Sequence, residues 1–240
     1  MTNKPITKKW IANFQAYCAP KQPIFERVLD LALRGEFDTA KGLLVEALPF
    51  KSYTKGVSRY YEAWEKLKLK NTHAKENRSR LKKNDLNRIF ERDFYQCRYT
   101  GVKLLSLEAI DLLKTLFYLH FPFPSYNGAY SITHIDVWTF YPQIDHIIPL
   151  KSPYNPSINS DTNLATVSSA FNTFFKGDLP IADFGIPLIE QENLDNTWDG
   201  LLEKSEMFKS MRKNEYQQEL QNSSMYYEER LAWAKANKKV

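Results

Sequence analysis

Apolar residues recur every three or four positions over most of the first third and the last fifth of the chain, which is the spacing of amphipathic helices. The pattern predicts a helical hairpin over residues 25–33 and 40–48, in which Gly35 ends the first helix and Asp38 caps the second. Further helices are predicted over residues 58–69, from about residue 84, over 106–119, and from about 198, with a long amphipathic stretch over 216–235.

The pattern changes in the middle of the chain, where β-branched and aromatic residues are frequent over residues 137–150. This composition predicts a strand, and Pro142 restricts it to a sheet edge or a bulge. Residues 163–166 predict a short second strand, and residues 167–176 predict a helix that ends before Pro180. Strands among many helices predict an α+β fold.

Composition places the chain among globular proteins. Charged residues make up 25% and hydrophobic residues 43%, values that argue against both disorder and a membrane bundle. Two cysteines cannot build a disulfide framework, and no apolar run approaches the roughly 20 residues that span a bilayer. The polar N-terminus has no signal-peptide core after it. We therefore expect a cytoplasmic protein without a membrane partner.

The positive charge is concentrated in one tract. The whole chain has a net charge of +5, whereas residues 66–92 contain ten basic and three acidic residues, a net charge of +7. Such a tract suits binding to a phosphate backbone, although a solvated helix face explains it about as well. The candidate phosphate contacts are Arg78, Arg80, Lys82, Lys83, Arg88, Arg92 and, just beyond the tract, Arg98.

A set of polar residues near the predicted strands could carry chemistry. Asp145 and His146 stand together inside the apolar run 144–150, where polar groups are costly unless they are paired or used. Adjacent strand residues face opposite ways, so the two side chains share one face only if the backbone bends. In the following predicted helix, Asn172 and Lys176 align on the flank of a phenylalanine face.

These side chains suit phosphodiester hydrolysis. Aspartate and asparagine oxygens are hard ligands for Mg²⁺, which keeps several waters and completes its shell with substrate phosphate. A histidine, whose ordinary pKa is about 6.5, can take the proton from an attacking water. Both roles fit a nuclease.

At these residues the sequence resembles the HNH, or ββα-metal, nuclease family. The resemblance lies in the run Ile-Asp-His-Ile-Ile-Pro-Leu at 144–150, in Asn-Leu at 163–164, and in Asn172 followed by Lys-Gly at 176–177. Residues 92–101 are similar to an upstream element of this family, with Arg-Asp, an aromatic residue, Cys and Tyr-x-Gly in that order. Together these segments cover about a fifth of the chain.

The resemblance implies a ββα-metal nuclease core embedded in predominantly helical additions. It implies that His146 is the general base and that Asp145 and Asn172 hold a Mg²⁺ or Mn²⁺ ion. Asn163 would fix the loop that holds His146, and Lys176 would contact phosphate or else interact with the end of its own helix. The implied activity is DNA cleavage in restriction or anti-phage defence.

The sequence departs from the family pattern at two places. Many members hold a structural zinc ion with two cysteine pairs, but here Thr100 stands at the second position of the first pair, and Ser168 and Phe171 stand at the second pair. Cys97 alone cannot hold zinc, so we expect no structural zinc and a core closed by hydrophobic packing. The second departure is a helical insertion over residues 102–143.

The expected organisation is a helical region over 1–70, a nuclease region over 71–182, and a helical region over 183–240. The terminal helices leave open homodimerisation, target reading or docking to a separate sensor or ATPase subunit. Two alternatives to a DNA nuclease also remain open. One is an RNA-cleaving or partner-activated HNH effector subunit, and the other is a non-catalytic nucleic-acid-binding module.

Overall fold

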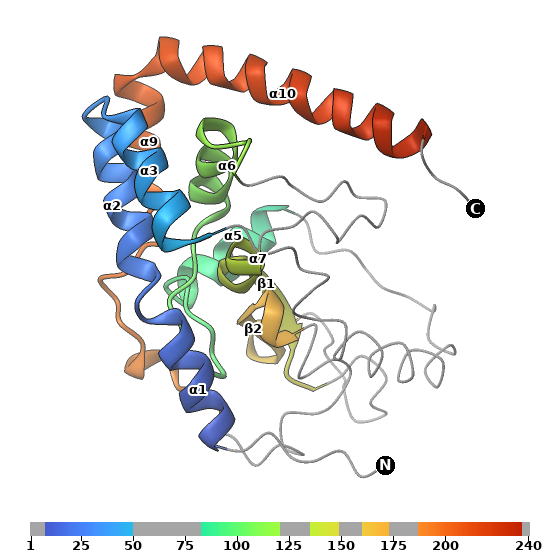
Figure 1. Cartoon of the computed structure of the whole chain (residues 1–240). Helices are drawn as coiled ribbons and strands as arrows, with labels where there is room; N and C mark the ends of the chain where they lie inside the picture. The colour runs from blue at the N-terminus through green and yellow to red at the C-terminus, as the bar shows by residue number, and fades with distance from the viewer. Residues whose placement is uncertain (1–7, 50–82, 121–134, 149–159, 173–186, 237–240) are drawn as a thin grey trace. The chain divides into compact units, whose positions relative to one another are not determined.

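The computed structural model describes residues 8–49, 83–120, 135–148, 160–172 and 187–236, which form helices and one small antiparallel sheet (Figure 1). The expected α+β class is confirmed at this level. The chain divides into two compact units, of which the first comprises Met1–Pro20, Val57–Ser106 and Thr139–Gly200 and the second Lys21–Gly56, Leu107–Trp138 and Leu201–Val240. Each unit therefore draws on all three of the contiguous regions expected from the sequence.

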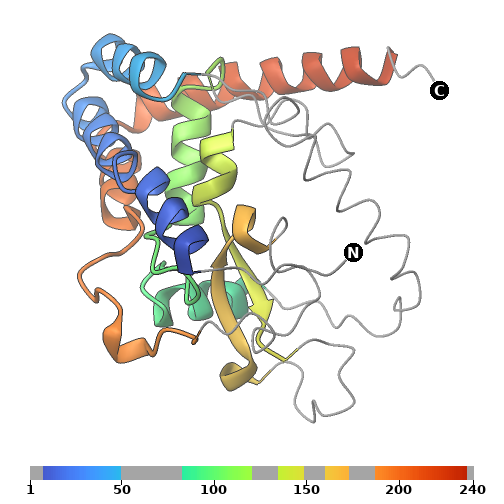
Figure 2. The ribbon, with the colours of Figure 1, turned by 60° about the horizontal axis from the view of Figure 1, so that its bottom comes forward.

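The first unit contains a two-stranded antiparallel ribbon, formed by β1 (Pro142–His146) and β2 (Leu164–Ser168). Figure 2 shows the two strands side by side. Their register pairs the first residue of each strand with the last residue of the other. Pro142 stands at the first position of β1, where a proline is tolerated in a strand. Directly paired residues point to the same side of the ribbon, so it has two distinct faces.

The two faces of the ribbon meet different neighbours. One carries Thr166, whose hydroxyl donates a hydrogen bond of 3.2 Å to the Ile89 carbonyl of α5 (Lys83–Arg92). The other carries Asp145, which meets the hydroxyl of Tyr99. After β2 the short helix α8 (Ser169–Phe171) begins, capped by Ser168, whose Oγ accepts from the Phe171 N–H at 3.4 Å. The helix expected over 167–176 therefore starts here, and residues 173–176 lie outside the described part.

A small hairpin over residues 96–103 lies along β2. Its ends pair at Gln96 and Lys103, and its turn closes where the Gly101 N–H donates to the Cys97 carbonyl at 2.7 Å. The Arg98 N–H donates to the Thr166 carbonyl of β2 at 2.9 Å. This 96–103 hairpin is also held by α1 (Lys8–Cys18), because the Gln15 amide donates to the Thr100 carbonyl at 2.6 Å.

The strand expected over 137–150 is wrong in its first part. Residues 135–140 form the helix α7 (Ile135–Phe140), and only 142–146 form a strand. Val137 and Phe140 are both buried and lie three residues apart, which is a helical spacing. The helix ends before Pro142, because the residue that precedes a proline disfavours helical backbone.

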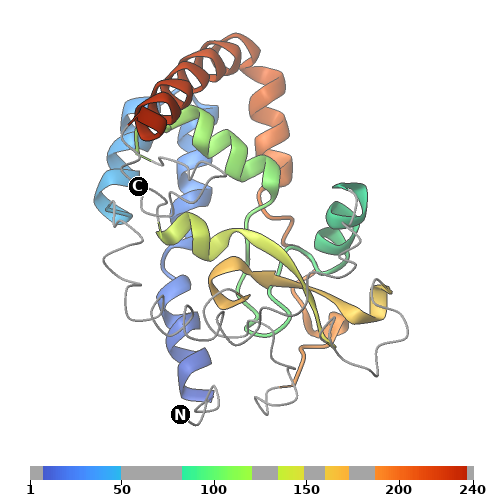
Figure 3. The same ribbon diagram turned by 90° about the vertical axis from the view of Figure 1, so that its right-hand side faces the viewer.

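The second unit is helical (Figure 3). Its elements are α2 (Gln22–Leu33), α3 (Phe37–Ala47), α6 (Leu107–Leu116), α9 (Leu202–Met211) and α10 (Lys213–Ala236). The expected helical hairpin is confirmed by α2 and α3, which Gly35 separates with a φ of +82°. Asp38 does not cap the second helix as predicted, because α3 begins at Phe37 and Asp38 lies in its first turn. Helix α2 packs against α3 and α9, and α10 packs against α6 and α9. The helix expected over 58–69 lies outside the described residues.

Among the helices that the structure describes, not one has both the length and the apolar character that crossing a membrane requires.

Candidate functional site

Asp145 is buried in β1 with only 6% of its surface exposed. Its Oδ2 accepts a hydrogen bond from the hydroxyl of Tyr99, which is itself 1% exposed. Burial and the nearby charge of Asp145 raise the pKa of Tyr99, so the phenol keeps its proton and acts as the donor. Sequence reasoning assigned Tyr99 no role, and its one signal was its place in the Tyr-x-Gly element.

Asn172 directly follows α8 and reaches back to β1. Its Nδ2 donates a hydrogen bond of 3.2 Å to Oε1 of Gln143. Gln143 and Asp145 are two residues apart in the strand, so their side chains point to the same face. The structure therefore brings the two predicted metal ligands, Asp145 and Asn172, to one face of the ribbon. Gln143 was missed, although its spacing from Asp145 could have indicated it.

His146 is placed differently from Asp145. It is the last residue of β1, it pairs with Leu164, and it is half-buried. The pairing continues through this residue, so strand alternation directs His146 to the opposite face from Asp145. The backbone bend that would bring the two side chains to one face is not present within β1. Lys176 lies outside the described residues.

Asn163 fastens the segment that follows His146. It ends the 3-10 turn η2 (Asp161–Asn163) directly before β2 and is 5% exposed. Its Oδ1 accepts from the Ile148 N–H at 2.8 Å, its Nδ2 donates to the Ile148 carbonyl at 3.3 Å, and its own carbonyl accepts from the Ile147 N–H at 2.9 Å. One residue thus holds the backbone on the far side of His146 by three hydrogen bonds.

Two arginines of α5 hold the η2 turn. Arg88 makes a two-pronged ion pair with Asp161, in which both side chains are about half exposed. The hydrogen bond from Arg88 lowers the pKa of Asp161. Arg92 donates to the Asp161 carbonyl at 2.6 Å and to the Leu164 carbonyl at 2.7 Å. Arg88 therefore presents a paired charge at the surface, whereas Arg92 joins α5 to the start of β2.

Asp93 lies at the centre of a buried charged network. Its side chain is 0% exposed and accepts from Arg92 at 2.8 and 2.9 Å, from Arg98 at 3.1 Å and from the Thr166 N–H at 2.8 Å. Arg98 is 7% exposed and also donates to the Ile189 carbonyl at 2.5 Å. Arg92 and Arg98 thus make structural contacts within the protein, and their phosphate contacts stay a prediction.

The structure gives no side-chain contacts for four of the other predicted phosphate-binding residues. Arg78, Arg80 and Lys82 lie outside the described residues, and Lys83 is described only as the first backbone position of α5.

Four positions lie close together at which nucleases of the family that the sequence resembles carry zinc ligands, namely Cys97, Thr100, Ser168 and Phe171. The buried Cys97 thiol, whose pKa is raised by burial, meets the Thr100 side chain and the Ser168 backbone. Phe171 packs against Tyr99, with ring centroids 5.5 Å apart. Hydrogen bonds and an aromatic contact thus fill this place. Among the residues with described positions, no group of three or more His, Cys, Asp and Glu side chains could hold a metal ion.

No family model, no curated protein and no solved structure matches this chain.

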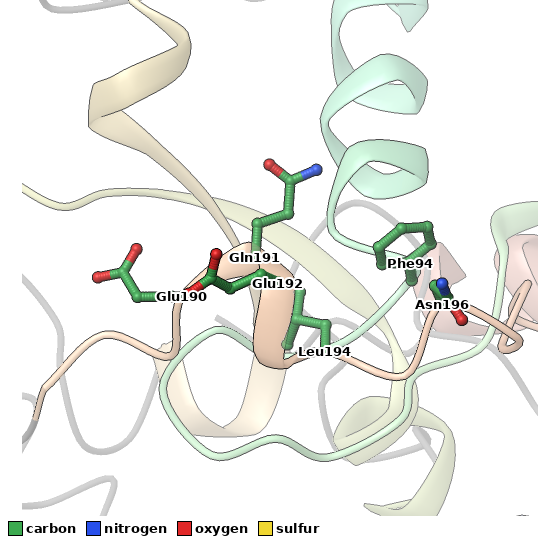
Figure 4. Close-up of a pocket in the computed structure, with 6 residues that line it drawn as sticks. All are labelled: Phe94, Glu190, Gln191, Glu192, Leu194 and Asn196. Carbon is green, nitrogen blue, oxygen red and sulfur yellow. The ribbon is translucent and has the colours of Figure 1, made fainter.

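A surface pocket of the first unit lies apart from the predicted chemistry. It has a volume of about 630 Å³ and adjoins the turn η5 (Gln191–Asn193). Its lining residues are Phe94, Glu190, Gln191, Glu192, Leu194 and Asn196, and Figure 4 shows Glu190 directed away from Phe94 and Asn196. Two carboxylates would repel a phosphate backbone, and none of the six is a predicted site residue. The ribbon face with Asp145 and Asn172 is therefore the candidate site.

Proposed function

We propose that the protein is a metal-dependent endonuclease of the HNH, or ββα-metal, type that hydrolyses phosphodiester bonds of DNA, with a role in restriction or anti-phage defence. The observation that carries this proposal is that Asn172 contacts Gln143, which lies on the same face of the β1–β2 ribbon as Asp145. Strand, strand and the start of a helix supply these residues in the order that the HNH resemblance implies.

Two further arrangements support the proposal. Asn163 makes the contacts that its implied role requires, because it fixes the backbone directly after His146. The positions at which the resembled family carries its two cysteine pairs are far apart in the sequence, and here they lie together between the 96–103 hairpin and the start of α8. A chance motif match would not be expected to bring these segments together.

The donor atoms at the ribbon face fit Mg²⁺ or Mn²⁺. Carboxylate and amide oxygens are hard ligands, and Mg²⁺ commonly takes only one or two protein ligands and fills its shell with water and substrate phosphate. We propose that Asp145 and Asn172 hold this ion. When bound, it would stabilise the charge that develops on the phosphate and the leaving oxygen.

Side chains of the protein would supply the general base and its positioning. Because His146 and Asp145 lie on opposite faces of the ribbon, the phosphodiester would lie across the end of the ribbon, with His146 on one side and Asp145 and Asn172 on the other. His146 would take the proton of the attacking water through a ring nitrogen as the new P–O bond forms and the old one breaks. Asn163 would hold the segment after His146, so that the imidazole is positioned before substrate binds.

The basic tract supplies the nucleic-acid surface in this proposal. Among its described residues, Arg88 has an exposed guanidinium, and a phosphate could replace Asp161 as its partner. Replacement of Lys82, Lys83 and Arg88 by Ala should weaken DNA binding and make it less dependent on salt. An unchanged salt dependence would remove these residues from the surface.

The test is cleavage of supercoiled plasmid DNA and of RNA by the full chain, with Mg²⁺, Mn²⁺ or EDTA. We expect DNA cleavage with either metal and none with EDTA. His146→Ala should lower the rate by about 10²–10⁴-fold, the usual contribution of a general base. His120→Ala is the matched histidine control, because His120 contacts the Leu48 carbonyl of the second unit. Asn172→Ala should also lose activity, and exposed Asn193→Ala is its control.

Each outcome has a distinct meaning. If the pure protein cuts no nucleic acid with any metal, or if His146→Ala cuts as fast as the original protein, the proposed mechanism is wrong. Cleavage of RNA alone would change the substrate class and keep the chemistry. Binding without cleavage would favour a non-catalytic module, and cleavage that appears only with a partner protein would favour an effector subunit.

A further inference from the structure

Tyr99 contacts the predicted metal ligand Asp145 from inside the protein. Both side chains are buried, and the phenol hydroxyl donates to the Oδ2 atom of the carboxylate. A buried carboxylate without donors is costly, and a hydroxyl donor fixes the rotation of the carboxylate plane. A carboxylate has about four acceptor positions, so a hydroxyl donor and a cation can bind the same carboxylate.

The ring of Tyr99 contacts the element that carries the second predicted ligand. It packs against Phe171 with centroids 5.5 Å apart and ring planes inclined by 32°. Phe171 is the last residue of α8, and Asn172 follows it directly. A single side chain therefore touches both the strand with Asp145 and the helix that leads to Asn172.

Three hydrogen bonds hold the backbone on either side of Tyr99. The Arg98 N–H donates to the Thr166 carbonyl of β2 at 2.9 Å, which fixes the backbone just before Tyr99. The Thr100 carbonyl, just after it, accepts from the Gln15 amide at 2.6 Å. The turn of the 96–103 hairpin is closed by the Gly101 N–H, which donates to the Cys97 carbonyl. The phenol therefore has a defined position relative to the ribbon.

We propose that Tyr99 is a positioning residue of the nuclease site, which orients the Asp145 carboxylate through its hydroxyl and Asn172 through Phe171. The inference rests on the proposed function, because it takes Asp145 and Asn172 as the ligands of a divalent cation. With both donors fixed in advance, the cation does not have to order them as it binds. Residues that orient metal ligands commonly contribute 10- to 100-fold to metal affinity or activity.

The experiment measures Mn²⁺ affinity without substrate, from the electron paramagnetic resonance of the free ion, on the full-length protein. Tyr99→Phe keeps the ring and removes the hydroxyl, and we expect its Mn²⁺ affinity to fall by about 10- to 100-fold. Tyr95→Phe is the matched control, since Tyr95 is a buried tyrosine of the same unit whose ring packs against Phe90. Its Mn²⁺ affinity should stay unchanged, whatever happens to its thermal stability.

A second variant and a second measurement complete the test. Phe171→Leu keeps the hydroxyl and removes the ring contact, and it should also weaken Mn²⁺ binding. In plasmid cleavage, Tyr99→Phe should need a higher Mn²⁺ concentration for half-maximal rate and should recover most of the rate when Mn²⁺ saturates. If Tyr99 only stabilised the fold, Tyr99→Phe, like Tyr95→Phe, would lower the melting temperature, but it would leave the Mn²⁺ concentration for half-maximal rate unchanged.

The outcomes separate this inference from the proposed function. If the original protein binds Mn²⁺ and cleaves DNA, and Tyr99→Phe and Phe171→Leu bind Mn²⁺ as tightly, the positioning role is refuted and the nuclease stands. If Tyr99→Phe does not fold, Phe171→Leu decides alone. If the original protein neither binds Mn²⁺ nor cleaves DNA or RNA, the proposed function fails and the inference fails with it.

Discussion

The buried network around Asp93 gives the sharpest test of the structure. Replacement of Asp93 by Ala removes an acceptor of four hydrogen bonds and leaves the guanidinium of Arg98, which is 7% exposed, without its counter-charge. Removal of one partner from a buried ion pair costs about 3–5 kcal/mol. A domain is stable by about 5–15 kcal/mol, so this change removes a large part of the total.

Urea denaturation followed by circular dichroism measures this loss. With a dependence of about 2 kcal/mol per molar urea, a loss of 4 kcal/mol lowers the unfolding midpoint by roughly 2 M. Asp93→Asn should lose less, because it keeps one acceptor oxygen. Asp161→Asn is the matched control, since it breaks an exposed pair with Arg88 and should change the midpoint little. A midpoint for Asp93→Ala within about 0.5 M of the original would refute the reasoning.

Three further predictions concern stability and can be measured by thermal or urea unfolding. Ser169→Ala should leave stability unchanged or raise it by up to about 1 kcal/mol, because among the described residues the buried Ser169 hydroxyl has no hydrogen-bond partner; a clear loss would contradict this. Gly200→Ala should cost about 1–3 kcal/mol or more, since Gly200 has a φ of +71° and an added Cβ would lie 2.6 Å from the Ser106 nitrogen; an unchanged midpoint would contradict it. Burial lowers the pKa of His120, so its neutral form contributes stability above about pH 6.5 that is lost as the pH falls. The original protein should therefore lose more stability than His120→Gln between pH 7.5 and 5, and parallel pH curves would show that His120 does not contribute.

The elements that sequence periodicity predicts best are those whose burial is local. The hairpin of α2 and α3 was predicted because its apolar positions repeat at three and four and because Gly35 separates the helices. Helix α1 has the same kind of pattern in Ile11, Phe14 and Cys18, and it lies inside the expected helical region over 1–70, but the pattern was not resolved into a separate helix. The first half of the expected strand became α7, because β-branched and aromatic residues also form short helices when tertiary packing requires it.

The candidate site was predictable only where a motif names its residues. A motif indicated Asp145, Asn163 and Asn172, and the structure brings Asn172 to the strand of Asp145 through Gln143. Tyr99 was not assigned a role, because its partner lies 46 positions further along the chain and no local pattern links the two. The same limit explains Arg92 and Arg98, which add to a basic run in sequence but meet Asp93 and backbone carbonyls in the fold.

The 96–103 hairpin joins fold stability to the position of the candidate ligands. In the zinc-containing nucleases that the sequence resembles, a metal ion would tie this hairpin to the start of the helix, whereas here Thr100 Oγ1 accepts from the Val102 N–H and Tyr99 packs on Phe171. A zinc ion would make no contact with the carboxylate of Asp145, but Tyr99 does. Because Tyr99 belongs to this hairpin and donates to Asp145, a change that loosens the hairpin should also move the hydroxyl that Asp145 accepts from. If Asp145 and Asn172 hold a divalent cation as proposed, variants of Tyr99 and Phe171 should therefore change both the stability of this hairpin and the affinity for the cation. Variants of residues that contact only the hairpin or only Asp145 and Asn172 should change one of these two properties without the other.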